Sequence, residues 1–156
     1  MTLLESLPQK LGSAEAWVEK GGVRWLDPGQ LSVRELCMEM IAAHARFITI
    51  TAYQLPKEEG IRLEYHWDLM GALLGFPFLL KTEPGEDPKI ESIFDLTAAV
   101  DWIEREIHEE YKVDFTGREY EPLLMRAGDT LGVNLREIAD ICKPETGAPG
   151  QEEVKK

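Results

Sequence analysis

Two glutamates one helical turn apart, Glu106 and Glu110, are the residues whose types and spacing best suit chemistry. Paired carboxylates can serve as general acid and general base when their surroundings separate their pKa values. Such catalysis also needs a pocket and a polarising group, and the sequence offers no third member at a recognised spacing. Glu104 and His108 share the same i, i+4 spacing, but two ligands do not make a metal site. We therefore do not expect catalysis by this chain alone.

These residues lie on a predicted helix that begins near Asp101. Apolar side chains recur there at helical spacing and define a face that can meet a core. They are Ala99, Val100, Ile103, Ile107 and Tyr111. The same helical projection places Arg105, His108 and Glu109 on the opposite face, where we expect solvent.

Carboxylates one turn apart destabilise an isolated helix by roughly 0.2–0.5 kcal/mol, so a cationic group should lie near them. The simplest interpretation is a solvated face with Arg105 and Lys112 nearby. The more specific hypothesis is that Trp102, Glu104 and Glu106 point at another protein of a larger assembly. The residues alone leave both open.

The helix and its flanks resemble the signature of the 30 kDa-type subunit family of NADH:quinone oxidoreductase (complex I). This family includes the equivalent small subunit of membrane-bound, energy-converting NiFe hydrogenases. The residues that match are Ser92, Ile93, Trp102, Glu104, Arg105, Glu106, Ile107, Tyr111, Phe115, Thr116 and Gly117. Upstream, Leu63-Glu-Tyr-His66 resembles a family strand that ends in Tyr-His, so the resemblance covers about residues 40–125.

Three features depart from the family pattern. His108 occupies a position where an aromatic residue is usual, and Lys112 replaces a usual glycine. Residues 118–122 replace a His-Pro-x-x-x-Arg ending. These differences favour a divergent, hydrogenase-type relative over an orthodox NADH-dehydrogenase member.

The resemblance implies a peripheral structural subunit of a membrane-bound, ion-pumping oxidoreductase, with no cofactor of its own. It would brace the large subunit near the small iron–sulfur subunit, on the cytoplasmic side of the membrane, and meet the membrane arm only indirectly. Iron–sulfur clusters, and the NiFe centre of a hydrogenase, would belong to partner subunits. The residues expected to bind partners are Trp102, Glu104, Arg105, Glu106, Tyr111, Phe115 and Pro122.

Composition is consistent with a cytoplasmic globular chain. The 156 residues suit one domain, and the net charge of −12 opposes binding to nucleic acid. Cys37 and Cys142 stand apart and suggest reduced thiols, and two cysteines cannot hold an iron–sulfur cluster alone. The start of the chain does not suggest a signal peptide, and the longest apolar run, residues 69–80, is shorter than the roughly 20 residues that a spanning helix needs.

The pattern predicts a single α+β domain over residues 1–121, with an antiparallel or mixed sheet and helices on one face, followed by an extended partner-binding or disordered tail over 122–156. The predicted strands are a short one near 23–27, a hairpin of 46–53 and 61–67, a third within 69–80, and a short extended exit at 113–115. Helical segments are predicted over 1–20, after Ser32, and around 135–142.

The helix after Ser32 has a clear start. Glu35 lies at the spacing of a capping box, and Cys37 falls on its apolar stripe, where we expect a core residue instead of a nucleophile.

A second hypothesis belongs to another functional class. A free-standing small-molecule binding or hydrolytic domain would bring Glu106, Glu110 and His66 together in a cleft. The predicted strands and helices neither require nor exclude that convergence.

Overall fold

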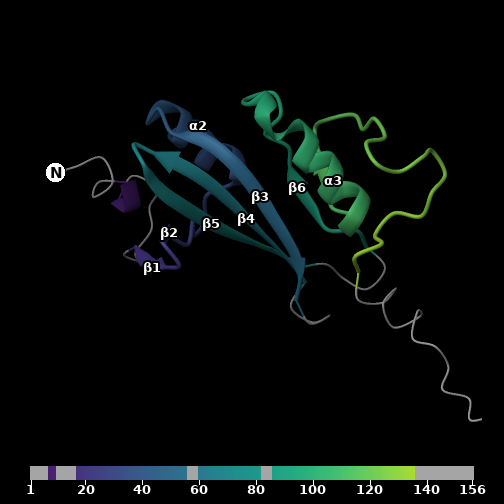
Figure 1. Cartoon of the computed structure of the whole chain (residues 1–156), viewed down its shortest axis with the longest axis horizontal. Helices are drawn as coiled ribbons and strands as arrows, with labels where there is room; N and C mark the ends of the chain where they lie inside the picture. Colours follow the sequence, from purple (N-terminus) through teal and green to yellow (C-terminus); the bar gives the residue numbers. More distant parts are fainter. Residues whose placement is uncertain (1–6, 10–16, 56–59, 82–85, 136–156) are drawn as a thin grey trace, which may run out of the picture.

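The computed structural model describes residues 7–9, 17–55, 60–81 and 86–135. These residues form one α+β domain, a mixed five-stranded sheet with helices on one face and a smaller two-stranded sheet (Figure 1). The elements in chain order are β1 (Val18–Lys20), β2 (Val23–Trp25), α2 (Val33–Ala42), β3 (Arg46–Gln54), β4 (Ile61–Leu69), β5 (Ala72–Leu80), β6 (Lys89–Glu91), the 3-10 turn η1 (Ala98–Val100), α3 (Asp101–Tyr111) and β7 (Asp114–Thr116). The predicted fold class is confirmed.

The large sheet has the strand order β1-β2-β5-β4-β3, in which β2 runs parallel to β5 and the other pairs are antiparallel. Buried and partly exposed residues alternate along β4, because successive side chains in a strand point to opposite faces. This alternation fixes the register, since a slip by one residue would turn Tyr65 and Trp67 away from the core. The predicted hairpin of β3 and β4, and the third strand after it, are confirmed.

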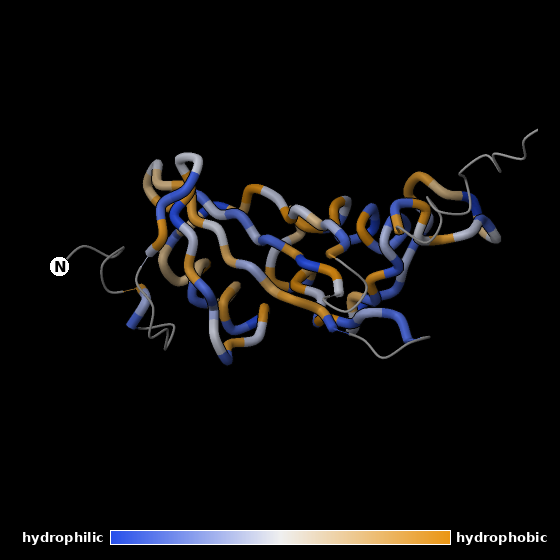
Figure 2. The backbone as a smooth tube through the Cα atoms, turned by 90° about the horizontal axis from the view of Figure 1, so that it is seen from below, coloured by the Kyte–Doolittle hydropathy of each residue, from blue (hydrophilic) through white to orange (hydrophobic). Residues whose placement is uncertain are grey.

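The core lies between the sheet and the helices. Leu36 of α2 and Ile107 of α3 pack in one cluster with Tyr65 and Trp67 of β4. α2 lies towards one end of the molecule and α3 towards the other (Figure 1). Hydrophobic stretches alternate with hydrophilic ones along the backbone, in the middle of the molecule and towards both of its ends (Figure 2). The two helices therefore cover different parts of one sheet face.

The predicted capping box begins α2. The Ser32 hydroxyl accepts from the Glu35 amide at 3.2 Å, and the Glu35 carboxylate accepts from the Ser32 amide at 2.8 Å. Cys37 is buried in the core, and burial raises the pKa of its thiol to about 11. The thiol is protonated at neutral pH, which fits a core residue and not a nucleophile.

Two local predictions were wrong. Val18–Lys20 is a strand, not part of a helix, because the turn at Gly21 and Gly22 lets it pair with β2. The strand β6 was not predicted, since three residues with charged ends carry little signal, and it forms by parallel pairing with β7. The helix predicted around 135–142 and the tail beyond Leu135 lie outside the described residues.

Gly75 allows β2 to approach β5. The Trp25 ring lies over this glycine, and a Cβ atom there would be 2.6 Å from Cε3 of the ring. The same ring makes an edge contact with His66, with 5.4 Å between ring centroids. The face opposite the helices is therefore partly covered by Trp25.

We predict that Gly75→Ala lowers the free energy of unfolding by about 1–3 kcal/mol, because the rigid Trp25 ring cannot yield to the added methyl group. Urea denaturation would measure the change. In the double variant with Trp25→Leu, the added cost of Gly75→Ala should largely disappear. Equal costs in both backgrounds would contradict the clash.

Candidate partner-binding site around helix α3

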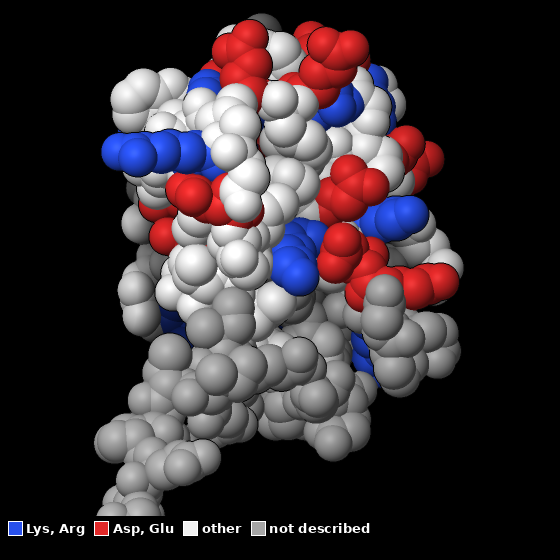
Figure 3. All heavy atoms as spheres, turned by 90° about the vertical axis from the view of Figure 1, so that its right-hand side faces the viewer, with Lys and Arg blue, Asp and Glu red and all other residues white. Residues whose placement is uncertain are grey.

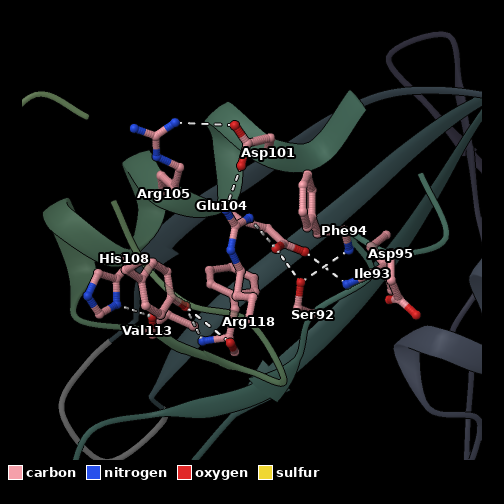
Figure 4. A network of polar contacts seen from close by, with 12 residues as sticks. Ser92, Ile93, Phe94, Asp95, Asp101, Glu104, Arg105, His108, Val113 and Arg118 are labelled. Atoms are coloured by element: carbon pink, nitrogen blue, oxygen red, sulfur yellow. Dashed lines mark hydrogen bonds and ion pairs between the residues drawn. The ribbon is translucent and has the colours of Figure 1, made fainter. Parts of the chain in front are cut away.

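A fully buried carboxylate, Glu104, anchors α3 to the segment before it. Its oxygens accept hydrogen bonds from the Ser92 hydroxyl at 2.6 Å and from the Ile93 amide at 3.0 Å. One nitrogen of Arg118 donates to the same carboxylate at 3.0 Å (Figure 4). A buried charge is tolerated only when it is paired and hydrogen-bonded, and Glu104 meets both conditions.

Arg118 connects two carboxylates of α3. It bonds Asp101 at 2.5 Å as well as Glu104, and its side chain is 6% exposed. Its guanidinium carbon lies 4.7 Å from the centroid of the Phe94 ring and 5.5 Å from that of Tyr120. The bond to Arg118 is the main reason why the pKa of Asp101 is lowered. Ion pairs and cation–π contacts thus hold this arginine between α3 and the chain after β7.

Arg105 reaches from α3 to the chain that follows residue 120. Its Nε donates to the Glu121 carbonyl and a terminal nitrogen donates to the Pro122 carbonyl, each at 2.9 Å. The other terminal nitrogen donates to Asp101 at 3.2 Å. Arg105 therefore holds a backbone segment.

Glu109, one turn further along α3, binds the same segment through its amides. Its carboxylate accepts from the backbone N–H of Leu123, Leu124 and Met125 at 2.6, 2.8 and 3.1 Å. Burial opposes ionisation, but these amides and the charge of Arg105 outweigh it and lower the pKa of Glu109. We call Arg105 and Glu109 together the α3 clasp, because one binds carbonyls and the other amides of residues 121–125.

His108 and Tyr120 close the other end of the site. Their rings stack at 3.7 Å between centroids, and His108 Nδ1 lies 2.9 Å from the Val113 carbonyl. The Tyr120 hydroxyl accepts from the Phe115 amide at 2.5 Å and donates to the Phe115 carbonyl at 3.3 Å. The Tyr120 hydroxyl therefore forms hydrogen bonds with both backbone polar groups of Phe115 in β7.

The residues predicted to bind partners fall into different environments. Trp102 is 72% exposed, and Pro122 is exposed as well. Glu106 and Tyr111 are partly buried on α3. Arg105 is mostly covered and its donors serve the chain itself. A partner contact by these five residues stays a prediction.

Two of the residues predicted to bind partners have side chains that are buried within this chain. Glu104 is 0% exposed and its oxygens bind groups of this chain. Phe115 is also 0% exposed and belongs to the core. The first is held inside by its hydrogen bonds and Arg118, and the second by apolar packing.

Sequence reasoning missed two residues of this site. Glu109 was placed on a solvent face, but it is 4% exposed because residues 123–125 cover it. Arg118 was treated only as a departure from the family pattern. The sequence did contain a signal for it, since the excess of carboxylates on α3 required a cation.

The cleft hypothesis is not supported by the geometry. His66 alternates with the buried residues of β4 and points to the sheet face opposite the helices, where it meets Trp25. Its Nε2 lies 3.1 Å from the Thr51 hydroxyl, and burial lowers its pKa. Glu106 and Glu110 belong to α3, which packs on the other face. The three side chains do not converge.

Two cavities adjoin α3 in the described part of the chain. The larger, of about 480 Å³, is lined by Glu86, Asp87, Lys89, His108, Lys112, Asp114, Thr130 and Leu131. The smaller, of about 190 Å³, lies between α3 and residues 120–131. His108 lines both, whereas Glu106 and Glu110 line neither. Among the described residues, no group of three His, Cys, Asp or Glu side chains is arranged to hold a metal ion.

Residues 31–142 match the family described as "Respiratory-chain NADH dehydrogenase, 30 Kd subunit". The chain belongs to this family. It is 34% identical over 70 residues to the C subunit of NADH-quinone oxidoreductase from Rhodopseudomonas palustris (strain BisB18). That match spans 45% of this chain and 35% of the relative, so about a third of the relative's length is covered.

Two solved structures share the fold of this 30 kDa-subunit family member. One is a chain of the membrane-bound sulfane sulfur reductase, an archaeal respiratory membrane complex, with a TM-score of 0.68 and 19% identity over 98% of this chain and 95% of the other. The other is the trypsin-resistant fragment (1–134) of Nqo5, with a TM-score of 0.56 and 19% identity. That match covers 76% of this chain and 98% of the fragment. In the described residues, no helix has the length and apolar character to cross a membrane.

We predict that Arg118→Met lowers the free energy of unfolding by about 3–5 kcal/mol, because it leaves the buried Glu104 without its cation. The matched control is Arg46→Met, which breaks an ion pair with Asp68 whose arginine is 77% exposed, and it should cost less than about 1 kcal/mol. Urea denaturation followed by circular dichroism compares them. Equal costs would show that the buried pair is not a main support of the fold.

We predict that Glu109→Gln destabilises the chain at pH 7 by on the order of 1–3 kcal/mol, because charged hydrogen bonds are replaced by neutral ones. The folded-state pKa of Glu109 is lowered, so its contribution is complete above the unfolded-state value of about 4.3 and is lost as the pH falls through the folded value. The difference between wild type and variant should therefore shrink below about pH 4. Urea denaturation from pH 7 to 3 measures it, and a constant difference would contradict the assignment.

Proposed function

We propose that this member of the 30 kDa-subunit family is a peripheral structural subunit of a membrane-bound, ion-pumping oxidoreductase. It braces the large subunit near the small iron–sulfur subunit of an energy-converting NiFe hydrogenase or a complex I relative. It carries no cofactor and is not catalytic alone, and the metal centres belong to its partners. It sits on the cytoplasmic side of the membrane and reaches the membrane arm only through other subunits. The observation that carries the proposal is the family match over residues 31–142.

The likeness in fold to a chain of an archaeal respiratory membrane complex supports a place in an assembly of that kind. That likeness extends over 98% of this chain and 95% of the other, whereas the sequence match to the curated relative covers 35% of that relative. The departures from the family pattern at His108, Lys112 and residues 118–122 favour a relative of such complexes over an orthodox NADH-dehydrogenase member.

The geometry of α3 supports a role in assembly. The inward carboxylate of Glu104 forms hydrogen bonds within the chain, and Arg105 and Glu109 bind the backbone of residues 121–125. Trp102 remains 72% exposed on the same helix. Exposed tryptophans are frequent energetic centres of protein interfaces, because they bury a large apolar area with few rotatable bonds. Trp102 and Glu106 are therefore the residues of α3 best placed to contact the large subunit.

The charge of the surface favours a basic partner. Residues 101–135 contain nine acidic and four basic residues. Acidic side chains gather in groups on the face at the α3 end of the molecule (Figure 3). A partner surface with arginines could form bidentate pairs with such carboxylates.

We predict that Trp102→Asp and Glu106→Arg each lower the amount of tagged chain retained in the complex by at least about tenfold, because each removes or reverses an interface contact. The tagged full chain would be purified from solubilised membranes of its own organism, and the co-purifying subunits identified by mass spectrometry. The matched control is Met70→Asp, an equally polar change at a 92% exposed residue of the β4–β5 turn.

The proposal requires that a large subunit of the NiFe or complex I type is purified together with the wild-type chain. Recovery of the chain without such a subunit would overturn it. Full retention of both α3 variants would remove Trp102 and Glu106 from the interface.

A further inference from the structure

Leu124 combines an exposed side chain with a fixed backbone. Its side chain is 66% exposed, while its amide donates to the Glu109 carboxylate at 2.8 Å. The amides on either side, of Leu123 and Met125, bind the same carboxylate. Loops on the surface of a protein are usually more mobile than the helices and strands that they connect. This one is fixed while it presents a leucine outwards.

The same helix holds the segment further along. The Gly132 amide donates to the Glu109 carbonyl at 2.7 Å, and the Asn134 amide donates to the Glu110 carbonyl at 3.0 Å. Arg105 holds the carbonyls that precede Leu123. Residues 121–134 are thus fastened to α3 at both ends by bonds to their backbone. Bonds of this kind fix the course of the chain and leave its side chains available.

Fixing the backbone in advance matters for binding. Association must offset the ordering of loops and side chains at an interface, and a segment that is already ordered loses less entropy. The clasp achieves this by burying a carboxylate, for which three amides and Arg105 compensate.

We propose that residues 121–125 form a preformed docking ridge, with Leu124 as its apolar anchor and with Arg105 and Glu109 as positioning residues. The ridge binds an apolar pocket with a basic rim, and this pocket lies on a protein that assembles with this chain. The inference deepens the proposed function and rests on it. Trp102 lies on the same stripe of α3 as the clasp, three and seven residues before its two members, and extends the ridge along the helix.

Charge decides between the possible occupants. Arg105 and Arg118 are used inside the chain, so residues 119–126 present two exposed carboxylates, Glu119 and Glu121, against one exposed cation, Arg126. A second copy of this chain would bring like charges together, since the net charge is −12. A basic rim on a different protein is attracted instead.

The first test places a photo-crosslinking amino acid at position 124 of the tagged full chain, in the complex purified from solubilised membranes. We expect a crosslink to one co-assembled protein, mapped by mass spectrometry to apolar residues next to lysines or arginines. The control is the same amino acid at position 70, which is also exposed, in the β4–β5 turn. Crosslinks only within the chain, to a second copy, or to an acidic surface would overturn the ridge.

The second test separates the anchor from its positioning residues. Leu124→Asp should lower retention in the complex at least about tenfold and leave hydrogen exchange of the free chain unchanged, whereas Leu124→Met should retain binding. Glu109→Gln should speed exchange of the amides of residues 123–125 at least about tenfold and lower retention too. Glu110→Gln, the neighbouring carboxylate, serves as the matched control.

The outcomes distinguish this inference from the proposed function. If the wild-type complex forms and Leu124→Asp is fully retained, the ridge is overturned and the proposed function stands. The same holds if Glu109→Gln frees the three amides without any loss of retention. If the wild-type chain is recovered without partner subunits, the proposed function fails and the ridge fails with it.

Discussion

The buried ion pair of Glu104 and Arg118 is the contact on which the arrangement of α3 depends. It joins the helix to the chain after β7, and the same carboxylate joins the helix to Ser92 and Ile93 after β6. Two charges out of water are costly, and such a pair is weak evidence for net stability. Its consequence is geometric, because a misplaced helix would leave a charge buried without a partner. One orientation of α3 is thereby strongly preferred, and with it the position of Trp102.

α3 acts on both of its sides. Its inner side meets the sheet through Ile107 and the β6–β7 region through Glu104, and its outer side holds residues 121–125 through Arg105 and Glu109. Side chains that a helical projection assigns to solvent are therefore covered by the chain itself. Residues 121–135 form no regular helix or strand, and several of their backbone groups bind α3 instead.

The strands and the start of α2 could be predicted because their signals are local. The alternation around Tyr65 and the capping box at Ser32 need no distant residue. The site depends on contacts between segments far apart in the sequence. That Glu104 is the buried carboxylate follows from Arg118, 14 residues away, and that Glu109 is covered follows from residues 123–125. Helical periodicity predicts neither the burial of Glu104 nor the covering of Glu109, because it shows only which residues share a face of the helix.

The contacts that α3 makes within this chain affect how the family signature should be interpreted. Glu104 and Arg105 belong to the segment that resembles the family, and both are engaged within this chain. Their presence can be explained by the fold alone, so it does not assign them to an interface. A partner contact is better sought in residues that the fold does not require. Trp102 and Leu124 are such residues, because their side chains are 72% and 66% exposed while the contacts of α3 within this chain hold their backbone. The internal contacts hold these two side chains in place, and the interface is expected where the clasp presents them.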